Sequence, residues 1–239
     1  DMSYAGKYSK PDYELLVSEG CDLAIENRMI THSPEVVEML QSFDIPVMIE
    51  YSSYEQHPLG KVEWVKFFGA LTGKEAKAEE AFAEQTEILE EVESGEKTGK
   101  TIAFFYVTSN GLIQVRQSTD YIPKLIELAG GRYIFENLED SGSGRSTLNM
   151  QVEDFYAGAK DADILIYNSS IDGGVTTVDE LIGKCNILKD FKAVQEGQVY
   201  CTTNDMYQQS MAIGYLLQEM HTVLTDDDTA KLRYLFLLQ

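Results

Sequence analysis

The pattern of apolar and polar residues predicts a chain in which short buried strands alternate with amphipathic helices. Apolar runs of strand length occur at residues 22–27, 45–51, 101–108, 163–168 and 198–202. Between them, apolar residues recur every three or four positions, as they do on one face of a helix. A strand, a helix and a second strand at this spacing form a βαβ unit, so we expect an α/β fold with parallel strands.

The predicted helices carry local start signals. Ser33, Pro34 and Glu35 are typical of a helix N-terminus, because Ser caps the first turn, Pro fits it and an acid faces the positive end of the helix dipole. Residues 72–75 (TGKE) match a capping box, which predicts a new helix over residues 74–94, about 30 Å long. Further helices are expected at residues 59–71, 118–129, 154–160 and 178–183, and from residue 204 or 205 to about residue 223.

The long helix lies between two β-rich regions. We therefore divide the chain into an N-terminal lobe over residues 1–57, a helical segment over residues 58–96 and a C-terminal lobe over residues 97–239. The helical segment includes the long helix, which can act as a strut that connects the two lobes.

Charge and composition narrow the function. The formal net charge is −21, which argues against a nucleic-acid partner or an anionic membrane surface, because both are bound through Lys and Arg. The acidity would tolerate a cationic or metal-containing ligand, and a surface that merely keeps the protein soluble explains it equally well. No apolar run in the sequence approaches the length of a membrane span.

The sequence contains no recognisable catalytic or metal-binding motif. Its three cysteines form no CxxC pair, and its three histidines show no HxH or HExxH spacing. It has no GxSxG elbow and no GxGxxG after a strand, and residues 141–146 (SGSGRS) fit a mobile loop better than a phosphate loop. We therefore assign no catalytic residue, no metal site and no cofactor, and do not expect an enzyme.

Candidate ligand residues follow from the predicted sheets, because ligands of parallel α/β sheets bind outside the carboxyl ends of the strands. In the first lobe this rule selects Arg28 and a cluster of Tyr51, Tyr54 and His57. Phenol and imidazole groups can ligate a metal or stack on a ring system, although the two tyrosines can also be ordinary rim residues.

In the second lobe the same rule selects Arg116, in a predicted loop over residues 108–117, together with Asn168 and Tyr207. We add Arg145, which lies in the Gly/Ser-rich segment. The planar guanidinium group of arginine suits carboxylates, catecholates and phosphates of a ligand. Alternatively, these arginines form ion pairs with nearby acidic side chains of the protein. We expect the loops of both lobes to meet in a cleft.

Several stretches, in this order, resemble the substrate-binding proteins of ABC importers for iron complexes, haem and cobalamin. They are PDYELL at residues 11–16, CDLAI at 21–25, FDIPV at 43–47, FGALTGKEAKAE at 68–79, IELAGG at 126–131, ADILI at 162–166 and FKAVQEGQVY at 191–200. The resemblance covers nearly the whole chain and implies two Rossmann-like lobes joined by a single long helix. In that comparison the first lobe is incomplete at its N-terminal side.

The resemblance also implies a function. It predicts an extracytoplasmic lipoprotein on the outer face of the cell membrane of a Gram-positive bacterium, which captures a chelated metal and passes it to an ABC permease. A ferric siderophore is the expected ligand, with haem and cobalamin next. Glu14 matches the family's docking acid for the permease on the first lobe, whereas the corresponding position on the second lobe falls near Gln208, which is not acidic.

Two other functions stay open. A receptor for a bare divalent ion would bind Zn²⁺ or Mn²⁺ tightly and lose this binding with His57. An enzyme or metallocluster scaffold on the same kind of α/β lobes would hold a cofactor and show turnover.

Overall fold

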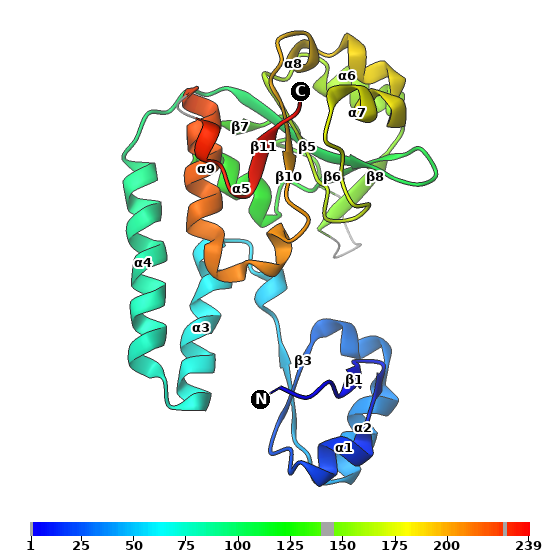
Figure 1. Ribbon diagram of the computed structural model, residues 1–239, viewed down its shortest axis with the longest axis vertical. Coiled ribbons are helices and arrows are strands. Elements are labelled where there is room, and N and C mark those ends of the chain that lie inside the picture. Colours follow the sequence, from blue (N-terminus) through cyan, green and yellow to red (C-terminus); the bar gives the residue numbers. More distant parts are fainter. Residues whose placement is uncertain (1, 140–145, 227–228) are drawn as a thin grey trace. The chain divides into compact units, whose positions relative to one another are not determined.

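The computed structural model describes residues 2–139, 146–226 and 229–239, and the chain divides into two compact units, Asp1–Tyr54 and Glu55–Gln239. Figure 1 shows the elements of each unit. No helix in the described residues is long and apolar enough to cross a membrane.

The first unit is a small βαβ structure. Its elements are β1 (Gly6–Lys7), β2 (Lys10–Pro11), α1 (Tyr13–Ser18), β3 (Ala24–Asn27), α2 (Pro34–Ser42) and β4 (Val47–Glu50). Strands β3 and β4 pair in parallel, as the sequence predicts, with α2 between them in the chain. Ile30, Val36, Leu40 and Ile45 form the buried core of this unit. Ser33 occupies the N-cap position of α2 as predicted, but its side chain makes no capping hydrogen bond.

The second unit is built on one mixed sheet. Its helices are α3 (Pro58–Thr72), α4 (Glu75–Glu93), α5 (Tyr121–Leu128), α6 (Val152–Ala159), α7 (Val178–Lys184), α8 (Lys192–Gln195) and α9 (Ile213–Thr225). Its strands are β5 (Thr101–Val107), β6 (Ile113–Arg116), β7 (Arg132–Tyr133), β8 (Thr147–Met150), β9 (Ile164–Tyr167), β10 (Val199–Thr202) and β11 (Leu235–Leu237). In the described residues the strand order is β11-β10-β9-β5-β6-β8, with β7 also paired to β5.

Alternating residues of the central strands pack into two separate hydrophobic cores, one on each face of the sheet. On one face of the sheet, Ile102, Phe104 and Ile166 pack with residues of α3, α4, α5 and α9. On the other face, Phe105 and Leu165 pack with residues of α6, α7 and α8. Because all positions of β9 and β10 and all but Tyr106 of β5 are buried, these strands appear in the sequence as nearly continuous apolar runs.

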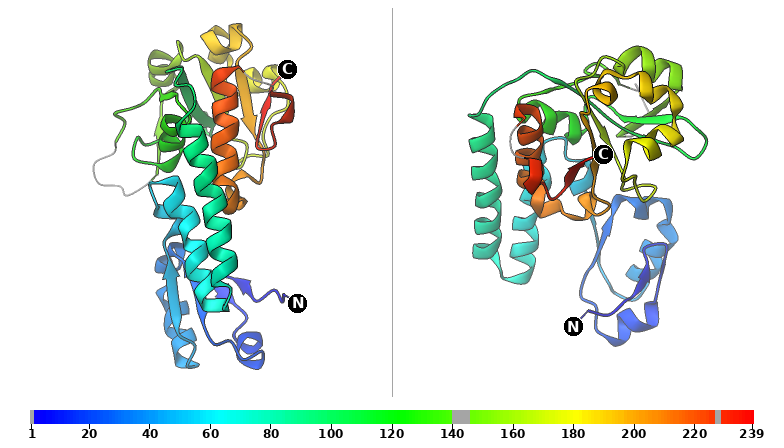
Figure 2. Two further views of the ribbon diagram at one scale, coloured as in Figure 1. Left: turned by 90° about the vertical axis from the view of Figure 1, so that its left-hand side faces the viewer. Right: turned by 45° about the horizontal axis from the view of Figure 1, so that its top comes forward.

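Helices α3 and α4 form an antiparallel pair within the second unit. Helix α4 also packs against α9, and the two views of Figure 2 agree with this arrangement. The predicted capping box between α3 and α4 is wrong. The hydroxyl of Thr72 donates back to the Phe68 carbonyl at 2.8 Å, inside α3, and Gly73 ends that helix in the left-handed conformation (φ 63°). Lys74 then takes the N-cap position of α4 without a side-chain cap.

Among the described residues, the sheet contains three antiparallel strands that the sequence analysis did not predict. Strands β7, β5, β9 and β10 pair in parallel, as expected, whereas β6, β8 and β11 run antiparallel to their neighbours. The predicted loop over residues 108–117 is therefore wrong, because β6 occupies part of it. The last helix begins at Ile213, several residues later than predicted, since two short 3₁₀ helices, Met206–Gln208 and Ser210–Ala212, precede it.

Candidate functional site

Three of the predicted ligand residues meet beside the carboxyl ends of β9 and β10. Asn168 follows β9, Tyr207 lies in the 3₁₀ helix after β10, and Arg116 is the last residue of β6. The Tyr207 hydroxyl oxygen accepts a hydrogen bond from Arg116 Nη2 and a second one, at 3.3 Å, from Asn168 Nδ2. We call these three residues the strand-end cluster.

The position of Arg116 depends on the sheet edge around it. Strand β6 runs antiparallel to β5, and the guanidinium carbon of Arg116 lies 5.9 Å from the centre of the Phe104 ring, which comes from β5. The Tyr133 hydroxyl, which comes from β7, donates to the Arg116 carbonyl at 2.8 Å and accepts from the Arg116 N–H at 3.0 Å. The backbone of Arg116 is thus held by Tyr133, while its side chain reaches Tyr207.

Asp120 is the ionic partner of Arg116. It is the N-cap of α5, where its Oδ1 accepts the Ile122 N–H at 3.0 Å, and its Oδ2 lies 3.6 Å from Arg116 Nη1. Only 6% of the Asp120 side chain and 11% of the Arg116 side chain are exposed. Burial raises the pKa of Asp120, and the opposing effects of Arg116, the Ile122 N–H and Lys61 do not cancel this rise.

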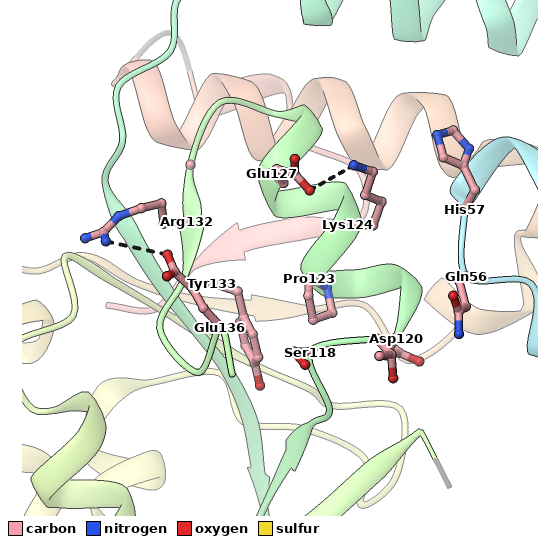
Figure 3. Close-up of a pocket in the computed structure, with 12 residues that line it drawn as sticks. Gln56, His57, Ser118, Asp120, Pro123, Lys124, Glu127, Arg132, Tyr133 and Glu136 are labelled. Atoms are coloured by element: carbon pink, nitrogen blue, oxygen red, sulfur yellow. Dashed lines mark hydrogen bonds and ion pairs between the residues drawn. The ribbon is translucent and has the colours of Figure 1, made fainter. Parts of the chain in front are cut away.

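A cavity of about 480 Å³ lies along α5 and includes Asp120 in its wall. We call it the α5 cavity. Figure 3 shows its lining, which comes from the start of α3, the turn before α5, one face of α5 and the segment around β7. The lining residues are Gln56, His57, Ser118, Thr119, Asp120, Pro123, Lys124, Glu127, Gly131, Arg132, Tyr133 and Glu136. Its volume falls in the usual range of small-molecule sites.

The remaining charged side chains of the α5 cavity pair with each other. Lys124 Nζ lies 2.9 Å from Glu127 Oε2, and Arg132 Nη1 lies 3.5 Å from Glu136 Oε1. Figure 3 shows these pairs on different walls. Both pairs are largely exposed, so each adds little stability. His57 caps α3, with Nδ1 accepting the Leu59 N–H at 3.2 Å.

The first unit brings three predicted residues together in a second group. Arg28 follows β3, and its guanidinium carbon lies 4.4 Å from the centre of the Tyr54 ring. The Tyr51 ring, which follows β4, meets Tyr54 edge to face at a centroid distance of 6.4 Å. Tyr51 is 45% and Tyr54 48% exposed, so both rings offer apolar surface to a ligand. We call these residues the aromatic cluster.

The other predicted residues lie elsewhere. His57, predicted with the two tyrosines, belongs to the second unit and lines the α5 cavity. Arg145 lies outside the described residues. Glu14 is exposed in the first turn of α1. Glu219, which is acidic but lies beyond the expected docking position, is buried, and its carboxylate accepts the backbone N–H groups of three consecutive residues, Arg233 to Leu235.

The sequence analysis missed Asp120 and Tyr133. An Asp directly before an apolar helical pattern is a readable N-cap signal, so the position of Asp120 at a helix start could have been found. Its pairing with Arg116 and the contact of Tyr133 with the Arg116 backbone arise from the packing of β6, β7 and α5. The described residues contain no group of three or more His, Cys, Asp or Glu side chains placed to hold a metal ion.

The comparisons with known proteins define the class to which this fold belongs. Residues 9–206 match the periplasmic binding protein family. The chain therefore belongs to that family, as the resemblance in the sequence indicates.

Two relatives in sequence are lipoproteins of Methanocaldococcus jannaschii. One lipoprotein of Methanocaldococcus jannaschii, itself uncharacterised, is 29% identical over 177 residues, which are 73% of this chain and 41% of the relative. A second lipoprotein of that organism is 26% identical over 203 residues, 82% of this chain and 50% of the relative. The chain thus spans half or less of the length of these relatives.

Solved structures share the fold at low sequence identity. A substrate-binding protein of an ABC transporter from Listeria monocytogenes superposes with a TM-score of 0.71 at 18% identity, covering 95% of this chain and 85% of that protein. The periplasmic haem-binding protein HutB of Vibrio cholerae gives 0.70 at 16% identity, covering 92% and 82%. A protein of an ABC-type Fe³⁺-hydroxamate transport system from Saccharomonospora viridis gives 0.63 at 16% identity, covering 88% and 71%.

Proposed function

We propose that this protein is the extracytoplasmic solute-binding protein of an ABC importer and that it captures an iron complex. A ferric siderophore is the first candidate, and haem and cobalamin are the next. Family membership supports a binding role, and the substrate classes named for HutB and for the Fe³⁺-hydroxamate system support an iron complex. Capture, not catalysis, is the proposed activity.

The strand-end cluster is the observation that carries the proposal. The Tyr207 oxygen already accepts two hydrogen bonds, one from Arg116 Nη2 and one from Asn168 Nδ2. Both of these nitrogen atoms can only donate. In the part of the chain that the structure describes, the Tyr207 hydroxyl proton has no acceptor of its own. This proton and the guanidinium suit an anionic oxygen, such as those of hydroxamates, catecholates and carboxylates that surround Fe³⁺ in a chelate.

The aromatic cluster supports the same class of ligand. A metal chelate has a charged or polar centre and a largely organic periphery, and haem is a flat ring. The exposed Tyr51 and Tyr54 rings can pack against such a periphery, and Arg28 adds a cation next to them. The predicted cleft between the lobes stays a prediction.

Partners and location follow from the same proposal. The ligand would pass to a membrane permease, with the exposed Glu14 as one docking residue. The relatives named lipoproteins support an anchored protein on the outer face of the membrane. The Gram-positive host stays a prediction from the sequence.

The proposal can be tested by a binding screen with ferric siderophores, haem, cobalamin and bare Zn²⁺, Mn²⁺ and Fe³⁺. The single tryptophan, Trp64, provides a fluorescence signal, and the melting temperature provides a second readout. A ligand at about 100 times its Kd should stabilise the protein by about 2.7 kcal/mol. Binding of one chelate without binding of bare ions supports the proposal. Binding of bare ions alone supports the metal receptor, and the absence of any binding refutes both.

A further inference from the structure

The α5 cavity has a mainly apolar wall, although several of its lining residues are charged. Most of the surface that the cavity exposes belongs to carbon atoms. Pro123 and Tyr133 are buried residues of this wall, and Figure 3 shows their side chains in the middle of the lining. Such a wall offers dispersion contacts and favours groups that gain from leaving water.

Each Asp, Glu, Lys and Arg of the lining already has an oppositely charged partner. The pairs, with their N–O distances, are Lys124–Glu127 at 2.9 Å, Arg132–Glu136 at 3.5 Å and Asp120–Arg116 at 3.6 Å. A charged group that entered the cavity would lose its hydration, and it would have to compete for a counter-ion that is engaged elsewhere. The lining therefore favours an uncharged occupant over a cation or an anion.

Several neutral polar groups of the wall are engaged as well. The Tyr133 hydroxyl donates to the Arg116 carbonyl and accepts from the Arg116 N–H. The Ser118 hydroxyl donates to Glu139 Oε1 at 3.3 Å, and His57 Nδ1 accepts a backbone N–H at the start of α3. Because these groups hydrogen-bond within the protein, an occupant rich in donors and acceptors would gain little from them.

One side chain joins the α5 cavity to the strand-end cluster. Arg116 Nη1 faces Asp120, which lines the cavity, and Arg116 Nη2 donates to Tyr207. Both nitrogens belong to the same guanidinium, so the cavity and the cluster adjoin one group. A ligand whose polar centre binds at Tyr207 can therefore reach the cavity with a side arm.

We propose that the α5 cavity binds an uncharged apolar arm of the ligand, and that an aromatic ring, which can pack against Pro123 and Tyr133, is its preferred occupant. This inference rests on the proposed function and narrows it. The preferred iron complex presents anionic oxygens to Tyr207 and carries an uncharged arm that ends in a ring. The volume of about 480 Å³ exceeds that of cavities that hold benzene, so a ring and its linker both fit. The exposed Gln56 and Thr119 can hydrogen-bond an amide in the linker.

Ferric chelates that differ only in one terminal group test the proposal. A linear trihydroxamate carries a terminal amine, which is left as an ammonium, acetylated or benzoylated. Isothermal titration should show that the benzoyl form binds about tenfold more tightly than the acetyl form, because the phenyl ring leaves water on binding. The ammonium form should bind no more tightly than the acetyl form. Equal affinity of the benzoyl and acetyl forms, or tightest binding of the ammonium form, overturns the proposal.

Filling the cavity should remove this preference. Gln56→Trp places a large side chain at an exposed lining position, and Gln218→Trp is the matched control at an exposed position of α9 outside the lining. The benzoyl preference should fall to within about twofold in Gln56→Trp and persist in the control. Thr119→Trp fills the cavity from another part of the lining, and melting curves verify that each variant folds. An unchanged preference in every folded filling variant overturns the proposal.

Small probes separate failure of this inference from failure of the proposed function. Benzyl alcohol, benzylammonium and benzoate have similar size and differ in charge, and ligand-detected NMR follows their binding without iron. Benzyl alcohol should bind most tightly and lose its binding in Gln56→Trp. If no chelate binds, the proposed ferric-siderophore ligand is refuted, while this result with the probes still supports the site. If benzyl alcohol does not bind, or a charged probe binds as tightly, the site is refuted by itself.

Discussion

The substitution Tyr207→Phe removes one oxygen atom at the centre of the strand-end cluster. Two donors lose their acceptor, namely Nη2 of Arg116 and Nδ2 of Asn168. A buried donor without an acceptor costs about 1–3 kcal/mol. Asn168 is 3% exposed and should show most of this cost, whereas Arg116 keeps its ion pair with Asp120 and should show less. We expect the free energy of unfolding to fall by about 2 kcal/mol.

Urea denaturation measures this change as a lower midpoint with an unchanged slope. A double-mutant cycle with Asn168→Ala then isolates the interaction, and we expect a coupling energy of about 1 kcal/mol. Tyr215→Phe is the control, because the Tyr215 hydroxyl bonds to Glu84 at an exposed position and its loss should cost less than about 0.5 kcal/mol.

The same variant should also bind the iron chelate about tenfold more weakly, because the hydroxyl donor offered to the ligand is lost. If Tyr207→Phe matches the wild type in stability to within about 0.5 kcal/mol, the cluster is not held by this oxygen and the reasoning is wrong. If stability falls and affinity does not, Tyr207 has a structural role and the ligand binds elsewhere.

Three further predictions concern separate parts of the molecule. Glu219→Gln leaves one of two acceptor oxygens for three backbone N–H groups. It should therefore lower the free energy of unfolding, measured by urea titration, by about 2–3 kcal/mol. A change below about 0.5 kcal/mol would show that this contact does not hold β11. Burial opposes ionisation of Asp163, but hydrogen bonds from Lys192 and Thr101 lower its pKa to about 2. The ionised carboxylate should therefore stabilise the fold above pH 4, and about 1–2 kcal/mol of this stabilisation should be lost as the pH falls from 4 to 2. Asp163→Asn should abolish that part of the pH dependence in melting curves, and an unchanged profile would contradict the assignment. Replacing the exposed Tyr51 and Tyr54 together by Ala should weaken chelate or haem binding at least tenfold while the melting temperature stays nearly constant; unaltered affinity would remove the aromatic cluster from the site.

Local signals predicted most of the regular elements. The apolar run at residues 101–108 became β5, and the helical pattern at residues 59–71 became α3. The missed strand β6 is instructive, because Ile113 and Val115 are buried while Gln114 and Arg116 are partly exposed, and this alternation is present in the sequence. The segment is only four residues long, and so short a pattern is difficult to separate from a loop.

The sequence by itself determined the α/β class, the parallel strands of each unit and the residue types available at the strand ends, because periodicity and end signals act over a few neighbouring residues. Only the tertiary structure decided which of these residues meet. Arg116, Asn168 and Tyr207 come from three separate segments and converge because β6 turns back along β5 beside β9. Asp120 acquires its buried charge from the same packing. Such contacts depend on strand order and burial, which join residues far apart in the chain and leave no local trace in the sequence.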